Sequence, residues 1–194
     1  MNNLYLLMNI ISILSSYFHI KYISNYTNIH EYKSLPDLIV DNLPDLSKNT
    51  FCKNIVDYSI LFCFLPIVFN ERYDLLRFTY KFFTIIFFLR AFTKFFTVLP
   101  SQDNNCVNDV KDPYCYITGY CNDKVFSGHT SLTLTLVLLT IENKLIDPKL
   151  NILLIISHIV YVLLILSTKS HYSVDVLVSY IITTSLFYNL KDKL

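Results

Sequence analysis

Six long apolar segments, separated by polar stretches, constrain the fold of this 194-residue chain more than any other feature. A bilayer core needs roughly 20 mainly apolar residues per helix, and each segment comes near that length. Only helices and closed barrels satisfy their backbone groups in lipid, and continuous apolar runs without alternation favour helices. We therefore predict an all-α, polytopic membrane protein with six transmembrane helices, at about residues 4–20, 55–69, 75–99, 125–141, 150–166 and 174–190.

The composition points to the same class. Hydrophobic residues make up 53% of the chain and charged residues 16%, whereas about a quarter of a soluble domain is charged. The net charge is +1 and the basic residues are scattered, which excludes nucleic acid as a partner because binding it needs a clustered basic face. The five cysteines show no C-x-x-C spacing, so we expect no metal site and no cofactor. Residues 1–194 are predicted to form a single transmembrane domain.

The number of spans decides which polar residues meet. The fourth and sixth spans begin on the same side of the membrane because the fifth returns between them, and six spans place both termini on one side. His129 lies where the fourth span begins, and His171 and Asp175 lie where the sixth begins. We therefore predict that two histidines distant in sequence share one site at the membrane interface.

His171 and Asp175 are four residues apart, a spacing that stacks two side chains on one face of a helix. A carboxylate that accepts the imidazole Nδ1–H fixes the tautomer and leaves Nε2 as a nucleophile or base. His129 could then act as the acid and base, which is worth about 10²- to 10⁴-fold in rate. The alternatives are histidines that only hydrogen-bond to loops and an Asp175 that only answers the helix dipole.

Glycine is scarce, with only Gly119 and Gly128 in the whole chain, and Gly128 directly precedes His129. Because glycine costs helix stability, we expect it to be kept for a close approach to the backbone or for a free amide. The amides that follow Ser127 at a helix start would bind an anion. The implied substrate carries a phosphate.

Arg90 is the charged residue of the third span that we expect to take part in binding. It lies about nine residues before the polar loop, roughly 13 Å down the helix. Ionisable groups at that depth are usually functional or paired, and a guanidinium could hold a phosphodiester. The alternative is that Arg90 snorkels to the interface or pairs with Asp57.

Two motifs resemble those of the sphingomyelin synthases and related lipid phosphotransferases, whose core is similar to the type-2 phosphatidic acid phosphatases. The first is Cys121-Asn122-Asp123 followed by Ser127-Gly128-His129-Thr130, with Asn122 in place of the family's glycine. The second is His171-Tyr172-Ser173, then Asp175-Val176, Tyr180 and Phe187, without the family's terminal Tyr-His.

Two further motifs are partly kept, in the family's order. Arg77, Arg90 and Thr97 match one of them, while Phe78 and Phe87 replace an arginine and a tyrosine. A Pro-Leu-Pro-Asp motif between the first two spans is represented by Leu35-Pro36-Asp37. The similarity covers nearly the whole chain.

The resemblance implies a fold with a PAP2-like helical core and a metal-independent ceramide phosphotransferase activity. His129, His171 and Asp175 would be its catalytic triad. A phosphocholine-type headgroup would pass from phosphatidylcholine to ceramide through a phosphohistidine, giving sphingomyelin and diacylglycerol. We assign substrate binding to five residues, of which Asp123 has a loop or cap role as its alternative: Arg90, Asp123, Ser127, Gly128 and Tyr172.

Other reactions use the same triad. They are transfer of phosphoethanolamine or phosphoinositol to ceramide, transfer to diacylglycerol, and hydrolysis by a lipid phosphatase; a lipid-binding membrane protein with a vestigial site is the non-enzymatic alternative. The family likeness predicts a multi-pass protein of the Golgi, endoplasmic reticulum or plasma membrane with a lumenal or exoplasmic catalytic face. The distribution of lysine and arginine would favour the opposite orientation.

Overall fold

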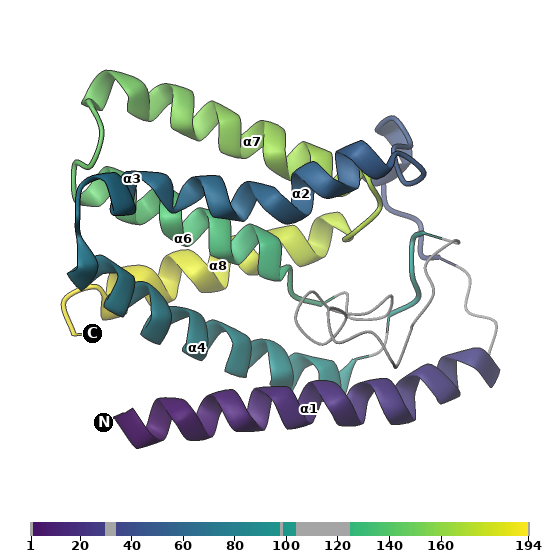
Figure 1. Cartoon of the computed structure of the whole chain (residues 1–194). Coiled ribbons are helices and arrows are strands. Elements are labelled where there is room, and N and C mark those ends of the chain that lie inside the picture. The colour runs from purple at the N-terminus through teal and green to yellow at the C-terminus, as the bar shows by residue number, and fades with distance from the viewer. Residues whose placement is uncertain (1, 30–33, 98, 104–124, 194) are drawn as a thin grey trace.

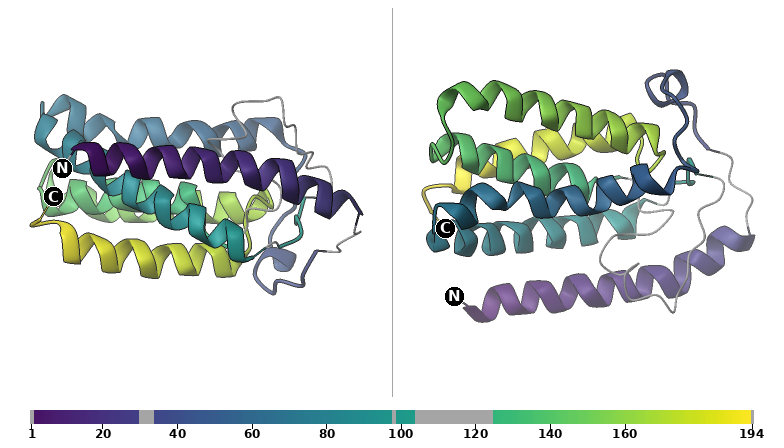
Figure 2. Two further views of the ribbon diagram at one scale, coloured as in Figure 1. Left: turned by 90° about the horizontal axis from the view of Figure 1, so that it is seen from below. Right: turned by 45° about the horizontal axis from the view of Figure 1, so that its top comes forward.

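The computed structural model of the protein describes residues 2–29, 34–97, 99–103 and 125–193. Across these ranges it contains helices and no strand, which confirms the predicted all-α class. The long helices run side by side in one bundle, and both ends of the chain lie at the same end of that bundle (Figure 1, Figure 2). The helices are α1 (Asn2–Ile29), α2 (Thr50–Cys63), α3 (Leu65–Phe69), α4 (Tyr73–Phe96), α6 (Gly128–Glu142), α7 (Asn151–Ser167) and α8 (Ser173–Leu190), with short 3-10 turns at Val40–Asn42 and Pro148–Leu150.

The predicted second span consists of two helices instead of one. Asn49 caps the start of α2 by accepting a hydrogen bond from the Cys52 amide. The break at Phe64 is explained by Pro66, which has no N–H to donate and whose ring crowds the carbonyl four residues earlier. The Ile67 and Val68 amides bond instead to the Phe64 carbonyl, which starts α3.

The ends of α1 and α4 also differ from the prediction. α1 continues to Ile29, well past the predicted end at residue 20, because nothing between residues 21 and 29 is a glycine or a proline. The predicted bounds are those of the apolar run, whose length is set by the thickness of the bilayer, whereas the helix itself continues into polar residues. α4 ends at Phe96, and the extended backbone of Thr97 leads the chain toward Pro100.

α6 is the central helix, and it packs against α2, α4, α7 and α8. Four of its threonines are buried among those neighbours: Thr130, Thr133, Thr135 and Thr140. The Thr133 hydroxyl donates to the His129 carbonyl (2.9 Å) and the Thr135 hydroxyl to the Ser131 carbonyl (2.7 Å), so these two buried hydroxyls are satisfied within the helix. Small hydroxyl residues also let helices approach closely.

A cluster of aromatic rings fixes α8 against α4. Phe187 of α8 meets Phe78 and Phe82 of α4 edge-on, with ring centroids 6.0 and 6.2 Å apart. Phe82 and Phe187 are almost completely buried. This packing sets the position of α8, and with it the position of the residues at its start.

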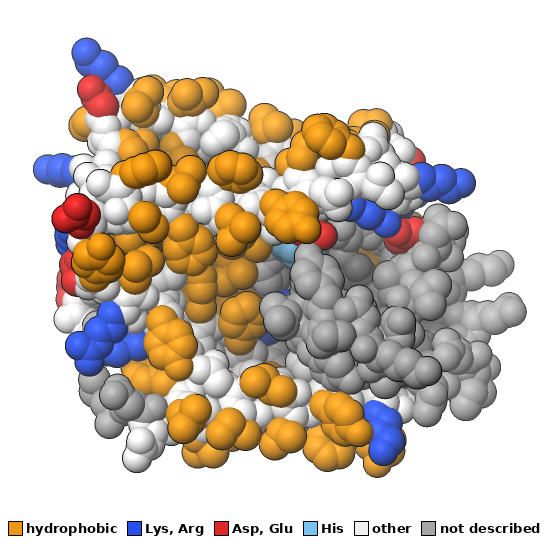
Figure 3. Space-filling view, in the orientation of Figure 1, with side chains coloured by type: hydrophobic (Ala, Val, Ile, Leu, Met, Phe, Trp, Pro, Cys, Tyr) orange, Lys and Arg blue, Asp and Glu red, His pale blue; other side chains and the backbone are white. Residues whose placement is uncertain are grey.

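Three stretches are long and apolar enough to cross a bilayer, Thr50–Phe69, Pro148–Ser167 and Ser173–Leu190, with mean hydropathies of 1.6, 2.5 and 1.2. Hydrophobic side chains fill the middle of the visible face and charged ones gather toward its two ends (Figure 3). The protein is therefore a helical membrane protein. That all six predicted segments cross the membrane stays a prediction, because α6 has only 15 residues.

Candidate active site

His129 and His171 lie side by side, at the starts of α6 and α8 respectively. Their ring centroids are 6.5 Å apart and the ring planes are inclined by 61°. The two helices begin at the same end of the bundle, as Figure 1 shows. A single phosphorus atom can therefore lie within reach of both imidazoles.

The carboxylate of Asp175 orients His171. Asp175 Oδ2 lies 3.2 Å from His171 Nδ1 and also accepts the backbone N–H of Tyr172 at 2.8 Å. Both side chains are buried, Asp175 completely. The Tyr172 amide helps to fix the carboxylate, and the carboxylate orients the His171 ring through Nδ1.

A second carboxylate, which the sequence analysis did not connect with His129, contacts that histidine. Asp57 Oδ1 from α2 lies 3.3 Å from His129 Nε2. The Asp57 side chain is 30% exposed and the His129 side chain 13%, so the pair is more accessible than the His171–Asp175 pair. The sequence carried one signal of this contact: Asp57 is a lone acidic residue inside an apolar segment. Such a residue is costly in a membrane unless it is paired or functional.

Ser127 connects α6 to α8. Its side chain caps α6 by accepting the Thr130 amide at 3.2 Å. Its backbone N–H donates to the Ser179 hydroxyl (2.8 Å), and that hydroxyl donates to the Ser127 and Asp175 carbonyls (3.1 and 2.7 Å). The hydroxyl of Ser127 is thus used by the helix cap, and the serine fixes the register of the two helices that carry the histidines.

Gly128 is the place where Arg90 approaches the backbone. A Cβ atom at position 128 would lie 2.6 Å from Arg90 Nη1, closer than real Cβ atoms come, and 3.3 Å from Cζ, which is a tight contact. Arg90 is only 4% exposed, so its guanidinium is packed beside the first turn of α6. The expected close approach is observed, and it brings a buried positive charge next to His129.

The hydroxyl of Tyr172 binds backbone groups of two other segments. Its hydroxyl donates to the Pro100 carbonyl at 3.0 Å and accepts the Leu35 amide at 3.1 Å. The side chain is 3% exposed. These contacts give Tyr172 a structural role, and its predicted role in substrate binding stays a prediction.

The two Leu-Pro-Asp repeats both hold the turn between α7 and α8. Asp37 Oδ2 accepts the Ser173 amide at 2.6 Å, while its Oδ1 accepts the amides of Ile39 and Val40. Asp45 pairs with Lys169 at 2.9 Å. His171 lies between Lys169 and Ser173 in the chain. The segment that precedes α2 therefore anchors the turn that carries His171 at two points.

These contacts change the acidity of both aspartates. Burial acts to raise the pKa of Asp37, but the hydrogen bonds from the Ser173, Val40 and Ile39 amides outweigh it, and the pKa is lowered. The hydrogen bond from Lys169, followed by those from Ser47, lowers the pKa of Asp45. Both carboxylates are therefore ionised at neutral pH.

Some predicted residues lie outside the described part of the chain. They are Asp123, assigned to substrate binding, and Cys121 of the first histidine motif. Within the described ranges, no cluster of three or more His, Cys, Asp or Glu side chains could hold a metal ion. What the structure assembles is an arginine, two histidines and two carboxylates.

Comparison with known proteins gives one family match and several relatives. Residues 120–193 match the family described as PAP2 superfamily C-terminal. The chain is 27% identical over 190 residues to the Mus musculus protein named sphingomyelin synthase-related protein 1, and 28% identical over 190 residues to the Homo sapiens protein of that name. Each alignment covers 82% of this chain, and 38% and 44% of the relative.

A third relative is named phosphatidylinositol:ceramide inositolphosphotransferase and comes from Trypanosoma cruzi. It is 31% identical over 124 residues, which cover 55% of this chain and 36% of the relative. The chain thus spans less than half the length of each curated protein that it matches here.

Proposed function

We propose that this chain, a relative of the sphingomyelin synthases and of the PAP2 superfamily, transfers a phosphorylated headgroup from a membrane phospholipid to ceramide. The family likeness, at modest identity, confirms the predicted resemblance and supports a lipid phosphotransferase in general. The donor, the acceptor and the roles of single residues are our inference. The observation that carries it is the His129–His171 pair, with one carboxylate on each ring.

In the first step, His171 Nε2 attacks the phosphorus of the donor phospholipid. A P–N bond forms and the P–O bond to diacylglycerol breaks. The departing oxygen takes a proton from His129, so that diacylglycerol leaves neutral and His129 becomes a base. Asp175 stabilises the positive charge that builds on His171, and Asp57 stabilises the protonated form of His129.

In the second step, the primary hydroxyl of ceramide attacks the phosphohistidine. His129 takes the hydroxyl proton as the new P–O bond forms and the P–N bond breaks, which returns the electron pair to His171. General acid–base help of this kind contributes about 10²- to 10⁴-fold. Both half-reactions use the same side chains, those of His129, His171, Asp57 and Asp175, so the scheme requires no metal.

Arg90 and the start of α6 provide the binding site for the phosphate in this proposal. The guanidinium lies against Gly128, and the backbone amides of the first α6 turn point out of the helix end. A helix start and a buried arginine both favour negative charge. They would stabilise the charge on the phosphoryl oxygens as it grows in each transition state.

Two headgroups are supported by different observations. Phosphocholine is supported by the motifs shared with the sphingomyelin synthases, and it is our first candidate. Phosphoinositol is the second, because the name of the Trypanosoma cruzi relative states phosphatidylinositol and ceramide as its substrates. From the family likeness we also propose a catalytic face on the lumenal or exoplasmic side of the membrane.

The experiment is expression of the full chain in a host without such activity, followed by incubation with labelled ceramide. Phosphatidylcholine, phosphatidylethanolamine and phosphatidylinositol are offered in separate reactions. We expect labelled sphingomyelin from phosphatidylcholine; labelled product from phosphatidylinositol alone would select the second candidate. Free headgroup phosphate without any ceramide product would show a hydrolase and overturn the proposal.

The variant His171→Ala tests the covalent step, and His158→Gln is its control. His158 lies on α7 beside Tyr161 and Tyr180, with ring centroids 6.4 and 5.6 Å away, and has no part in the scheme. We expect His171→Ala to lose both the transfer activity and the labelled phosphoenzyme, while His158→Gln keeps both. Unchanged turnover in His171→Ala would end the mechanism.

A further inference from the structure

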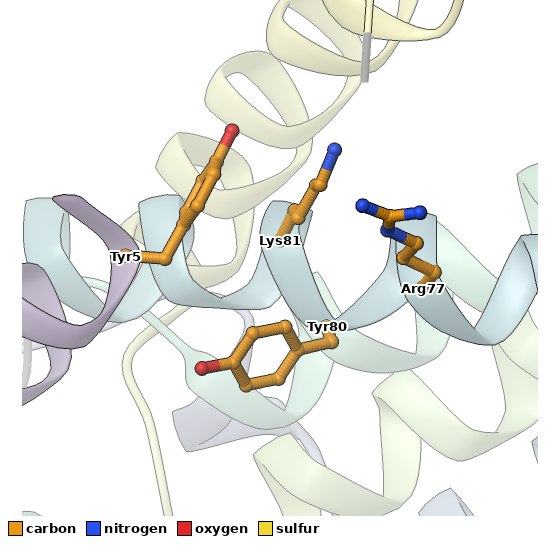
Figure 4. Close-up of a pocket in the computed structure, with 4 residues that line it drawn as sticks. All are labelled: Tyr5, Arg77, Tyr80 and Lys81. Atoms are coloured by element: carbon orange, nitrogen blue, oxygen red, sulfur yellow. The ribbon is translucent and has the colours of Figure 1, made fainter. Parts of the chain in front are cut away.

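A second polar site lies toward the other end of α4, away from the histidines. A pocket of 410 Å³ is lined by Tyr5 of α1 and by Arg77, Tyr80 and Lys81 of α4 (Figure 4). Arg90, beside Gly128, is nine residues beyond Lys81 and 13 beyond Arg77, which is about 13 to 20 Å along the helix. The pocket and the histidines therefore lie in opposite halves of the bundle.

The pocket concentrates positive charge. Arg77 and Lys81 are four residues apart on α4 and project to the same side of it (Figure 4). Two like charges at this spacing repel each other, and an anion bound beside both would offset that repulsion. Arg72, five residues before Arg77, is held by Asp74 at 2.7 and 2.8 Å, whereas within the described ranges no carboxylate pairs with Arg77.

Lys81 and Arg77 differ in exposure, which suits a ligand that reaches the buried cation by passing the exposed one. Lys81 is 5% exposed, and its Nζ lies 5.8 Å from the centroid of the Tyr5 ring. Arg77 is exposed. A buried ammonium can hold a phosphate at the base of the pocket, and a guanidinium at the mouth can bind two of its oxygens at once.

The rim of the pocket has the character of a membrane interface. The Tyr80 ring is 56% exposed, and its hydroxyl accepts a hydrogen bond from Asn9 at 3.0 Å. Beside Tyr5, the α1 side chains Leu4, Leu6 and Leu7 are 52–58% exposed. Tyrosines at headgroup depth beside exposed leucines are typical of the boundary between water and hydrocarbon.

We infer that this pocket binds the phosphate of an anionic phospholipid from the leaflet opposite to the two histidines. The cations hold the phosphate, and the leucines of α1 lie along the acyl chains. Basic pockets between transmembrane helices bind lipid headgroups in this way. A zwitterionic headgroup is disfavoured because its own cation would lie near Arg77 and Lys81. The inference does not depend on the proposed reaction.

The test is native mass spectrometry of the purified full chain in detergent micelles. Phosphatidylglycerol and phosphatidylcholine with identical acyl chains are added in equal amounts, and the retained lipid is counted. We expect phosphatidylglycerol to be retained selectively, and its affinity to fall about tenfold or more in Arg77→Gln/Lys81→Gln. The control Lys144→Gln/Lys149→Gln removes the same charge from the exposed turn between α6 and α7, at the same end of the bundle, and should leave retention unchanged.

Two further variants keep the test independent of folding. Arg77→Gln alone changes an exposed side chain and should weaken retention by about threefold or more, while Arg77→Lys/Lys81→Arg keeps both charges and should retain the lipid. Equal affinities for wild type and Arg77→Gln/Lys81→Gln would overturn the inference, as would equal retention of the two lipids. Glycerol 3-phosphate that displaces the lipid at similar concentration would show a site for a soluble phosphate, and so would also overturn it.

Discussion

Asp57 Oδ1 lies 3.3 Å from His129 Nε2, although the two residues come from α2 and α6 and are far apart in sequence. The contact gives each histidine a carboxylate of its own, because Asp175 contacts His171. The pairs differ in exposure: Asp175 is completely buried, while Asp57 is 30% exposed. In the proposed mechanism, the buried pair would suit the histidine that is phosphorylated, and the accessible pair would suit the histidine that exchanges protons with the two substrates.

Replacing Asp57 by Asn should slow headgroup transfer by about tenfold to 100-fold. The amide keeps the shape but not the charge that stabilises protonated His129, and the loss should stay below the full value of acid–base help. The measurement is the rate of labelled ceramide conversion in vesicles, with Glu71→Gln as the control. Glu71 is exposed in the turn between α3 and α4. A rate within twofold of wild type would remove Asp57 from the site.

Replacing Asp175 by Asn should reduce transfer by about 10²- to 10⁴-fold. Asp175 Oδ2 accepts from both His171 and the Tyr172 amide, and an asparagine would have only one oxygen and no charge for these tasks. The rate of phosphoenzyme formation in a single turnover reports the effect. Asp192→Asn, an exposed change after α8, should behave as wild type. Normal phosphoenzyme formation in Asp175→Asn would contradict the assigned role.

Gly128→Ala should impair donor binding more than folding. The new Cβ would lie 2.6 Å from Arg90 Nη1, and the guanidinium, the far end of a flexible side chain, can move away. We expect KM for the phospholipid donor to rise about tenfold while the thermal midpoint changes little. Arg90→Lys should give a similar KM, and Gly128→Ala/Arg90→Lys should not be much worse, since both changes act on one contact. Additive losses would argue against a shared mechanism.

Asp37→Asn should destabilise the protein in a pH-dependent way. The pKa of Asp37 is lowered in the folded state, so its stabilisation is fully present above the unfolded value, about pH 4, and is lost as the pH falls from there through the lower folded value. At pH 7 the loss of charge-assisted bonds to Ser173 and Val40 should cost about 1–3 kcal/mol. Thermal midpoints of wild type and variant, measured from pH 7 to pH 3, should converge at the acid end. A constant difference over that range would contradict the assignment.

The local pattern around the histidines was readable because it depends on short spacings. The His171–Asp175 contact follows from a helical repeat of 3.6 residues, and the meeting of His129 with His171 follows from the parity of the spans. The close approach at Gly128 followed from the rarity of glycine. Each of these inferences needs only residue spacing, the number of spans or the residue composition, and none needs the packing of one helix on another.

Other features depended on which helix faces which. Asp57 could as well have paired with Arg90, and only the packing of α2 against α6 brings it to His129. The hydroxyl of Tyr172 could have faced a substrate, but the paths of residues 34–36 and 99–101 place backbone groups around it. In the same way, the apolar run at residues 55–69 did not predict the two helices that result.

The sequence by itself determined the helices, their membrane-like composition, the order of the two histidine motifs and the carboxylate one turn after His171, because these depend on local spacing and on the cost of exposing backbone to lipid. Only the tertiary structure decided that Asp57 serves His129, that Asp37 and Asp45 hold the turn before α8, and that Arg77 and Lys81 share a pocket with Tyr5. The reason is physical: pairing across helices is fixed by the collective packing of side chains from segments far apart in the chain, and no short pattern encodes it.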